Sequence, residues 1–234
     1  MKNPIYSINK ISISKNNKRT LDIRKLDIHR GSCYVIYGDI GSGKSTLLNL
    51  LCKKEPASNG AVFYENSDLN KISARSFNSD VYHVPQGLKI PWFKVSVEGY
   101  INKMVNSHSS ITDPKNGIKN IINKMKLNKY LERDYRKLSD GERRWVELAV
   151  SIACDTKVLL IDGFGQYLGE ERMNILTRIL YRKINFDGVT VIVSTHSKDR
   201  LSRIASVFIR LEQGKIVSVR SKKKYSAPYK KSKK

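Results

Sequence analysis

The sequence predicts an α/β fold with a mostly parallel core sheet, an N-terminal antiparallel β subdomain and an inserted helical subdomain at about residues 91–140. Three observations lead to this prediction. Apolar and polar residues alternate near the N-terminus, which is typical of half-buried strands. Short apolar runs then alternate with helical patterns along most of the chain, which favours parallel strands joined by crossover helices. Two neighbouring helical patterns interrupt that alternation after residue 90.

In the first half of the chain, residues 5–13 and 21–28 are the alternating, half-buried strands. Residues 33–37 form a continuous apolar run that ends at Gly38, as expected of a strand buried on both faces of a parallel sheet. The elements predicted next are, in order, a helix over 46–52, strands over 61–64 and 81–84, and the two inserted helices over 97–105 and 117–126.

From residue 141 onward the alternation of helix and strand returns. An amphipathic helix is predicted from apolar residues at helical spacing, namely Met173, Leu176, Ile179, Leu180 and Ile184. The other elements predicted here are a helix over 141–153 and strands over 158–161, 189–194, 206–211 and 215–219. We therefore interpret residues 1–219 as one domain that is followed by a separate tail over 220–234.

The chain is strongly basic, since 44 Lys and Arg against 21 Asp and Glu give its 234 residues a net charge of +23. Residues 220–234 contain eight basic residues and no acidic one, so we expect this tail to be disordered. It could tether the protein to anionic lipid, at roughly 1 kcal/mol per basic residue near the membrane, or to nucleic acid. The alternative is a solvated tail without a partner.

Several protein classes are excluded by the sequence. No apolar run reaches the ~18 residues of a membrane-spanning helix, and the first residues lack the apolar core of a secretory signal. Cys33, Cys52 and Cys154 are far apart and show no metal-binding spacing, which fits a reducing cytosol without disulfides. We therefore expect a soluble intracellular protein.

The strongest motif follows the strand predicted at 33–37. Residues 38–46 match the phosphate-binding loop pattern G-x-x-x-x-G-K-[ST]. Glycines let backbone N–H groups surround phosphate oxygens at the positive end of the next helix. Lys44 would supply a charge for the β- and γ-phosphates, and the Ser45 hydroxyl would ligate Mg²⁺. The candidate nucleotide-binding residues are Gly38, Asp39, Ile40, Gly41, Ser42, Gly43, Lys44, Ser45 and Thr46. The motif predicts that the fold is a P-loop NTPase.

Four further polar segments follow in order. Gln86 comes just after one predicted strand, Asp162 ends another, and His196 follows a third. Residues 139–142 open the helix predicted at 141–153. Taken singly, each has an ordinary structural interpretation: a surface amide, a strand-end turn, the start of a helix, or an N-cap.

Taken together, the five segments resemble the ATP-binding cassette (ABC) family over roughly residues 3–218. The resemblance implies that Lys44 is the Walker A lysine, Gln86 the Q-loop residue, Asp162 the Walker B aspartate, His196 the switch histidine, and Ser139, Asp140, Gly141 and Glu142 the signature. Asp140 and Glu142 replace the commoner Gly and Gln of the signature, which is a mild departure.

The resemblance also implies a mechanism that needs ATP and Mg²⁺. Two cassettes would dimerise head to tail and hold ATP between the Walker motifs of one and the signature of the other. Ser45, Gln86 and Asp162 would serve the metal, and His196 would contact the γ-phosphate and position the attacking water. His196 and Gln86 are thus the candidate catalytic residues.

In this interpretation the protein is the ATP-binding subunit of an ABC transporter or a related transmembrane complex. It would couple ATP-driven dimerisation with an identical or different cassette to a transmembrane permease, at the cytoplasmic face of the inner or cell membrane. The alternatives are a nucleotide-gated regulatory or structural cassette, and a ribosome- or nucleic-acid-associated protein. The last is disfavoured, because such family members generally carry two cassettes in one chain.

One departure from the family pattern affects catalysis. Members usually have a Glu directly after the Walker B Asp as general base, and here that residue is Gly163. The expected Asp of the following loop is replaced by Gly169. Losing a positioned base typically costs about 10²–10⁴ in rate, so we expect a weak ABC-type ATPase that still binds Mg-ATP. Glu170 or Glu171 could reach back, but both are expected to serve the N-terminus of the next helix.

Three aromatic positions remain open. The loop over 14–20 lacks the aromatic residue on which the family stacks adenine, so stacking is weak or is supplied elsewhere. Tyr6 is one example of a residue that could supply it, although a core or edge-strand position is favoured for Tyr6. Trp92 and Phe93 either dock a membrane subunit or pack within the helical subdomain. Trp145 is predicted to lie in the core.

Overall fold

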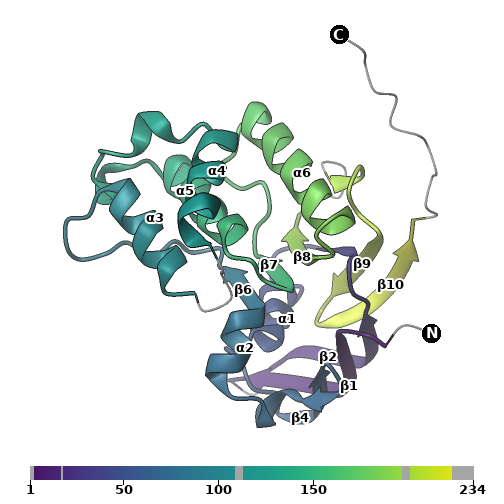
Figure 1. Cartoon of the computed structure of the whole chain (residues 1–234). Coiled ribbons are helices and arrows are strands. Elements are labelled where there is room, and N and C mark those ends of the chain that lie inside the picture. Colours follow the sequence, from purple (N-terminus) through teal and green to yellow (C-terminus); the bar gives the residue numbers. More distant parts are fainter. Residues whose placement is uncertain (1–2, 17, 109–112, 197–200, 223–234) are drawn as a thin grey trace.

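The computed structural model describes residues 3–16, 18–108, 113–196 and 201–222. Figure 1 shows helices α3, α4 and α5 grouped at one end of the molecule and the strands β1, β2 and β4 at the other. The helices are α1 (Lys44–Leu51), α2 (Ala74–Asp80), α3 (Val97–Asn106), α4 (Pro114–Lys124), α5 (Asp140–Ala153) and α6 (Glu170–Asn185).

The strands form two sheets. The antiparallel sheet has the order β2-β1-β4-β5, formed by β1 (Tyr6–Lys15), β2 (Lys18–Ile28), β4 (Asn59–Tyr64) and β5 (Ser67–Asp68). The larger sheet has the order β10-β9-β3-β8-β7-β6, formed by β3 (Cys33–Tyr37), β6 (Val81–Val84), β7 (Val158–Ile161), β8 (Thr190–Thr195), β9 (Val207–Glu212) and β10 (Lys215–Ser221). All its pairs are parallel except β10 with β9, which confirms the predicted parallel core sheet.

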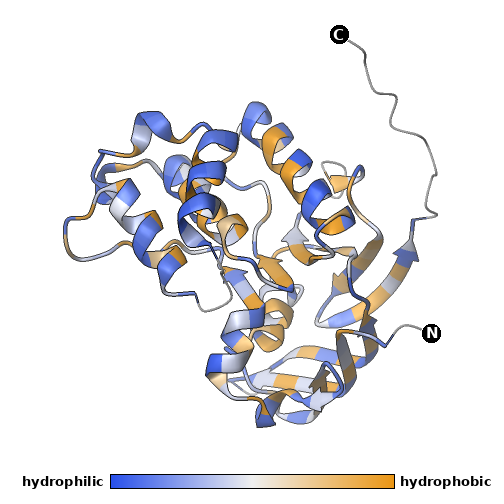
Figure 2. Ribbon diagram, viewed as in Figure 1, coloured by the Kyte–Doolittle hydropathy of each residue, from blue (hydrophilic) through white to orange (hydrophobic). Residues whose placement is uncertain are grey.

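The larger sheet separates two hydrophobic cores. On β7, Leu159 and Ile161 join the core beneath the helices α3 to α6, while Val158 and Leu160 join the core shared with the antiparallel sheet. This follows from the alternation of side chains along a strand. Figure 2 shows β7 as hydrophobic along its length, which is the pattern of a strand buried on both faces.

The helices pack through the faces that their sequence spacing predicts. On α6, Met173, Leu176, Leu180 and Ile184 are buried, and Ile179 is half-buried beside them. Figure 2 shows the resulting alternation of hydrophobic and hydrophilic turns along α6. Each fully buried side chain of this size contributes about 1.5–3 kcal/mol relative to an exposed one, so this face is sufficient to hold the helix against the sheet.

Several predicted boundaries are wrong for identifiable reasons. Helix α1 begins at Lys44, two residues before the predicted start, because Gly43 is its N-cap. Helix α4 begins at Pro114 rather than 117, since Asp113 caps it and Pro suits the first turn. Helix α2 and strand β5 were not predicted. Strand β10 continues to Ser221, so Arg220, assigned to the tail, pairs with Phe208 of β9. Residues 223–234 of the predicted tail lie outside the described residues.

The described residues contain no helix that combines the length and the apolar character needed to cross a bilayer. Cys33, Cys52 and Cys154 are free thiols, and Cys33 and Cys154 are buried. Burial raises the pKa of the Cys33 and Cys154 thiols to about 12, so both are inert packing residues at neutral pH.

Candidate functional site

The candidate site lies where four parallel strands end. The loops that follow β3, β6, β7 and β8 meet at the carboxyl edge of the sheet, which is where α/β folds bind their ligands. They enclose a cavity of about 420 Å³. Its lining residues are Thr20, Ile40, Gly41, Gly43, Lys44, Ser45, Thr46, Gln86, Asp162, Gly163, Gln166, Ser194, Thr195 and His196.

The cavity brings together most of the predicted site residues, but three residues of the phosphate-binding loop and the four signature residues do not line it. Gln86, Asp162 and His196 come from three separate strand ends and line it with the phosphate-binding loop. Gly38, Asp39 and Ser42 belong to that loop but do not line the cavity. The signature residues 139–142 are also absent from its walls. The signature residues therefore lie apart from the cavity that contains the phosphate-binding loop.

The phosphate-binding loop needs glycine at its last turn. Gly43 has a φ of +100°, and a Cβ placed there would lie 2.9 Å from the carbonyl oxygen of Thr20. Any side chain would be strained by that backbone angle and would collide with β2. Helix α1 begins at the next residue, so its free N–H groups and positive end face the loop.

The Lys44 ammonium is held by the loop that surrounds it. Its Nζ donates to the carbonyl oxygens of Gly38 (2.8 Å) and Asp39 (2.7 Å) and to Ser42 Oγ (3.2 Å). Burial lowers the pKa of Lys44, and the negative charges of Asp162 and Asp39 oppose that shift. The loop thus keeps a charged group within reach of an anion that enters the cavity.

Asp162 is fixed from several directions. Its N–H donates to the carbonyl oxygen of Val84 at 2.9 Å, and its carboxylate accepts a hydrogen bond from Ser194 Oγ. The same Ser194 Oγ accepts from the N–H of Gly163 at 2.8 Å. Asp162 is only 5% exposed, so these contacts set the direction of its carboxylate.

The donor set of the cavity suits Mg²⁺. Asp162, Ser45 and Gln86 all line the cavity, and their side chains carry a carboxylate, a hydroxyl and an amide oxygen. Mg²⁺ prefers oxygen ligands and is usually bound through one or two carboxylates, with water and phosphate oxygens completing its shell. These residues therefore fit the metal that the sequence analysis expects.

One buried charge in the site was not anticipated. Arg144 of α5 is 1% exposed, and its guanidinium donates to the carbonyl oxygens of Pro85 and Asp162. Burial lowers the pKa of Arg144, and the charges of Asp162 and Glu147 oppose the shift. The available signal was a charged residue on the apolar face of a predicted helix, four positions before Leu148.

Arg144 belongs to a wider buried polar network. The Glu147 carboxylate accepts hydrogen bonds from the hydroxyls of Tyr135 (2.8 Å) and Tyr100, whose rings stack at 4.0 Å between centroids. Burial raises the pKa of Glu147, and these hydrogen bonds and Arg144 oppose the shift. The network joins α5 to α3 and to the 3₁₀ turn at Tyr135–Lys137.

The turn after β7 is formed around Gly163. Gly163 has a φ of +68°, and the N–H of Gln166 closes the turn by donating to its carbonyl oxygen at 3.2 Å. Glu170 and Glu171 lie in the first turn of α6, as predicted, and neither lines the cavity. Glu171 instead pairs with Lys126 Nζ at 2.8 Å.

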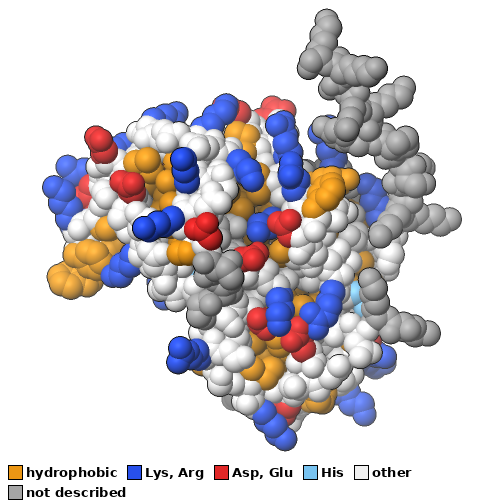
Figure 3. Space-filling model, in the orientation of Figure 1, with side chains coloured by type: hydrophobic (Ala, Val, Ile, Leu, Met, Phe, Trp, Pro, Cys, Tyr) orange, Lys and Arg blue, Asp and Glu red, His pale blue; other side chains and the backbone are white. Residues whose placement is uncertain are grey.

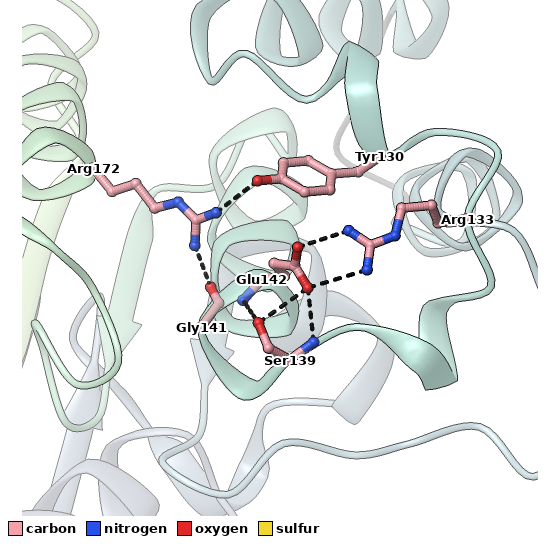
Figure 4. Close-up of polar contacts among 6 residues, drawn as sticks. All are labelled: Tyr130, Arg133, Ser139, Gly141, Glu142 and Arg172. Atoms are coloured by element: carbon pink, nitrogen blue, oxygen red, sulfur yellow. Dashed lines mark hydrogen bonds and ion pairs between the residues drawn. The ribbon is translucent and has the colours of Figure 1, made fainter.

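The signature forms a capping box at the start of α5 (Figure 4). The N–H of Glu142 donates to Ser139 Oγ at 3.3 Å, and the Glu142 carboxylate accepts from the N–H and hydroxyl of Ser139 at 2.8 and 3.0 Å. Partial burial raises the pKa of Glu142, but the hydrogen bonds from Ser139 and the charge of Arg133 outweigh it, so the pKa is lowered. The Ser139 hydroxyl is therefore directed at its own chain.

Two arginines fix the signature from either side, as Figure 4 shows. Arg133 pairs with the Glu142 carboxylate at 2.7 Å. Arg172 of α6 donates to the carbonyl oxygen of Gly141 and to the Tyr130 hydroxyl, each at 2.9 Å. The signature is thus anchored both to the helical part and to the helix that follows the Asp162 turn.

The aromatic positions divide clearly. Tyr6 is fully buried and its hydroxyl donates to the carbonyl oxygen of Leu51 at 3.0 Å, so it belongs to the core and cannot stack on a base. Trp145 is 2% exposed and its indole N–H donates to Met125 at 2.9 Å, which confirms the predicted core position. Trp92 is 89% exposed, so its packing within the helical part is ruled out.

Comparison with known proteins places these features in context. A family model described as ABC transporter matches residues 21–163. A probable sulfate/thiosulfate import ATP-binding protein of Chlorella vulgaris is 29% identical over 223 residues, which cover 94% of this chain and 92% of that protein. A putative ABC transporter ATP-binding protein of Onion yellows phytoplasma is 26% identical, and the match covers 92% of this chain but 37% of that protein. A dimeric bacterial ABC transporter cassette superimposes with a TM-score of 0.81 at 19% identity, covering 94% of this chain and 100% of that one.

Proposed function

The chain belongs to the ABC transporter family as an ATP-binding cassette, and from this premise we propose that it binds Mg-ATP at the phosphate-binding loop and couples nucleotide-driven dimerisation to a membrane partner. The observation that carries the proposal is the meeting of Lys44, Gln86, Asp162 and His196 at one cavity. These side chains come from four loops that are far apart in the sequence, and together they offer the charges and donors that a nucleoside triphosphate requires.

The residues of the cavity would act in defined roles. Lys44 would exchange the carbonyl oxygens of Gly38 and Asp39 for β- and γ-phosphate oxygens, while backbone N–H groups of the loop surround the phosphates. Ser45 and Gln86 would ligate Mg²⁺ directly and Asp162 through water. The metal, when bound, neutralises phosphate charge. His196 would contact the γ-phosphate.

The signature would serve a second cassette, identical or different. Ser139 and Gly141 stand at the N-terminus of α5, where the helix dipole favours an anion such as the γ-phosphate held by the partner. Support comes from the similarity in fold to a cassette that was solved as a dimer. The Ser139 hydroxyl would have to release the Glu142 carboxylate before it could donate to that phosphate.

A membrane permease subunit is the proposed partner for the exposed aromatic residues after Gln86. Trp92 and Phe93 contact each other edge to face at 5.6 Å between ring centroids, and Lys103 lies 4.7 Å from the Phe93 ring. The cassette would sit at the cytoplasmic face of the membrane. Lys and Arg side chains are spread over the visible face in Figure 3, and the Lys-rich segment 220–234 would add attraction to anionic lipid.

A second candidate is a nucleotide-gated cassette that closes on ATP and regulates a complex without useful turnover. Gly163 favours it, because the residue after Asp162 offers no carboxylate to activate water. The two candidates share ATP binding and dimerisation and differ in hydrolysis.

The test uses the purified full chain. ATP binding is measured by equilibrium dialysis with and without Mg²⁺, dimerisation by sedimentation, and turnover by phosphate release. Lys44→Ala should abolish binding, whereas Lys71→Ala, which removes an exposed lysine outside the cavity, should not. Wild-type protein that fails to bind ATP would overturn the proposal. Dimerisation without Lys44-dependent turnover would favour the gated cassette.

A further inference from the structure

The space beside Gly163 is already occupied. A Cβ built on Gly163 would lie 2.5 Å from Oε1 of Gln166 and 2.8 Å from its Cδ, so the Gln166 amide stands where a side chain at 163 would begin. The turn is set by the φ of +68° at Gly163 and by the hydrogen bond from the Gln166 N–H to the Gly163 carbonyl oxygen. The turn that places the Gln166 amide beside residue 163 is therefore compatible with glycine at that position.

The Gln166 amide faces the nucleotide cavity. Gln166 is among the residues that line this cavity, together with Asp162, Ser194, His196 and Lys44. Within the described part of the chain no hydrogen bond engages the Gln166 side chain, so its oxygen and nitrogen are available to a group in the cavity. The carboxylates next in sequence do not reach this place, because Glu171 pairs with Lys126 and Glu170 lies exposed at the start of α6.

We propose that Gln166 takes over the task of the absent glutamate by orienting the water that attacks the γ-phosphate. This inference rests on the proposed binding of Mg-ATP at Lys44. Phosphoryl transfer depends mainly on position and charge, and a glutamine can hold the attacking water in other nucleotide hydrolases. An amide does not take a proton, so the reaction it supports is slower than one with a carboxylate base and does not titrate with the glutamine.

The step balances without a protein base. Oε1 of Gln166 accepts a hydrogen bond from one O–H of the water and turns the oxygen lone pair toward the γ-phosphorus. The water oxygen bonds to that phosphorus, and the bond to the β–γ bridging oxygen breaks with its electron pair remaining on ADP. A water proton passes to a γ-phosphate oxygen, so ATP⁴⁻ and H₂O give ADP³⁻ and H₂PO₄⁻.

The experiment compares variants of the full chain in phosphate release and in ATP binding. Gln166→Ala should lower the Lys44-dependent turnover by about 10²-fold, the order of loss expected when a reacting group is no longer held in position, with unchanged ATP affinity. Gln166→Glu keeps the length and an acceptor oxygen but adds a base. The turnover of Gln166→Glu should therefore increase with pH as the new carboxyl group loses its proton. The pH profile of wild-type turnover should not show this increase.

Glu170→Ala is the matched control, because Glu170 lies four residues further on and outside the cavity. It should leave turnover unchanged. Turnover that is unaffected by Gln166→Ala, or that is lost in Glu170→Ala, would overturn the assignment of Gln166. Wild-type protein that binds ATP and shows no Lys44-dependent turnover would overturn it as well, while leaving the proposed nucleotide site intact. Absence of ATP binding would instead refute the proposed function itself.

Discussion

The side chain of Arg144 donates a hydrogen bond to the backbone carbonyl oxygen of Asp162, so the signature helix α5 is tied to the residue expected to serve Mg²⁺. A second nitrogen of the same guanidinium donates to Pro85, the residue before Gln86. The planar fork of arginine can hold two oxygens in fixed directions, which the single ammonium of lysine cannot do. One buried side chain therefore sets the backbone of two candidate metal-binding positions.

The first prediction concerns Arg144→Met, which keeps an extended side chain but leaves two buried carbonyl oxygens without donors. Each unsatisfied group costs about 1–3 kcal/mol, so the free energy of unfolding should fall by about 2–6 kcal/mol in urea titrations. The Mg²⁺ concentration for half-maximal ATP binding should rise about tenfold, a change of about 1.4 kcal/mol, while metal-free ATP affinity stays the same.

The matched control is Arg143→Met, since Arg143 bonds to Asp140 and Arg136 but to neither metal-site loop. It should leave the Mg²⁺ dependence unchanged. An equal shift in both variants would show that a general loosening of α5 is responsible and that Arg144 has no positioning role.

The second prediction concerns Gly163→Glu, the substitution that would restore the family pattern. The φ of +68° disfavours a side chain by about 1–2 kcal/mol, and the new Cβ would collide with Gln166. Thermal unfolding should show lower stability, and turnover should not increase. In Gly163→Glu with Gln166→Gly the collision is absent, so part of the stability should return and turnover should exceed that of Gln166→Gly alone. If the loss of stability in the double variant equals the sum of the losses in the two single variants, residues 163 and 166 do not collide and the prediction is wrong.

The third prediction concerns Glu142→Gln in the signature. The change removes the charged carboxylate that accepts a hydrogen bond from the Ser139 hydroxyl. The weaker acceptor leaves this hydroxyl able to donate to a phosphate instead. We expect ATP-dependent dimerisation to strengthen by up to about tenfold in sedimentation experiments, at a loss of about 0.5–1 kcal/mol from the weakened cap and the lost ion pair with Arg133. Asp140→Asn removes one charge from the same turn without touching Ser139. If it strengthens the dimer equally, net charge and not the Ser139 hydroxyl is responsible.

The fourth prediction is a pH dependence of stability that arises from His83 on β6. Burial, together with the nearby Lys54 ammonium, lowers the pKa of His83 from 6.5 to about 4. The unfolded chain binds this proton before the folded chain does, so stability is lost as the pH falls from about 6.5 to 4. The contribution amounts to about 3 kcal/mol at its limit.

His83→Gln should therefore flatten the difference in unfolding free energy between pH 7 and pH 4 by up to that amount, measured by urea titration at several pH values. His29→Gln replaces an exposed histidine and provides the comparison. A wild-type pH profile in the His83 variant would refute the assignment.

Much of the site was predictable because its residues lie at strand ends that the sequence marks. The runs over 33–37 and 158–161 are apolar, and the run over 81–84 is apolar apart from His83. They stop at a glycine, an aspartate and a proline respectively, and these strands have the predicted bounds. A motif at the end of a parallel strand is brought to a common edge by the topology alone.

The parts that could not be predicted depend on contacts without a sequence pattern. Arg144 bonds to backbone carbonyl oxygens, and a carbonyl has no residue identity to recognise. Helix α2 buries only Phe77, so it has no apolar period, although Ser73 offered an N-cap signal. The place of Gln166 follows from the positive φ at Gly163, which spacing cannot indicate.

The division of the interior by the larger sheet has a consequence for how the protein tolerates heat and mutation. Successive residues of β7 belong to different cores, yet the strand leads directly to one site residue, Asp162. A substitution that loosens the packing of either core therefore affects the position of Asp162 through β7. On heating, ATP binding should be lost at the temperature at which the less stable of the two cores unfolds. Substitutions that stabilise only the more stable core should leave this temperature unchanged.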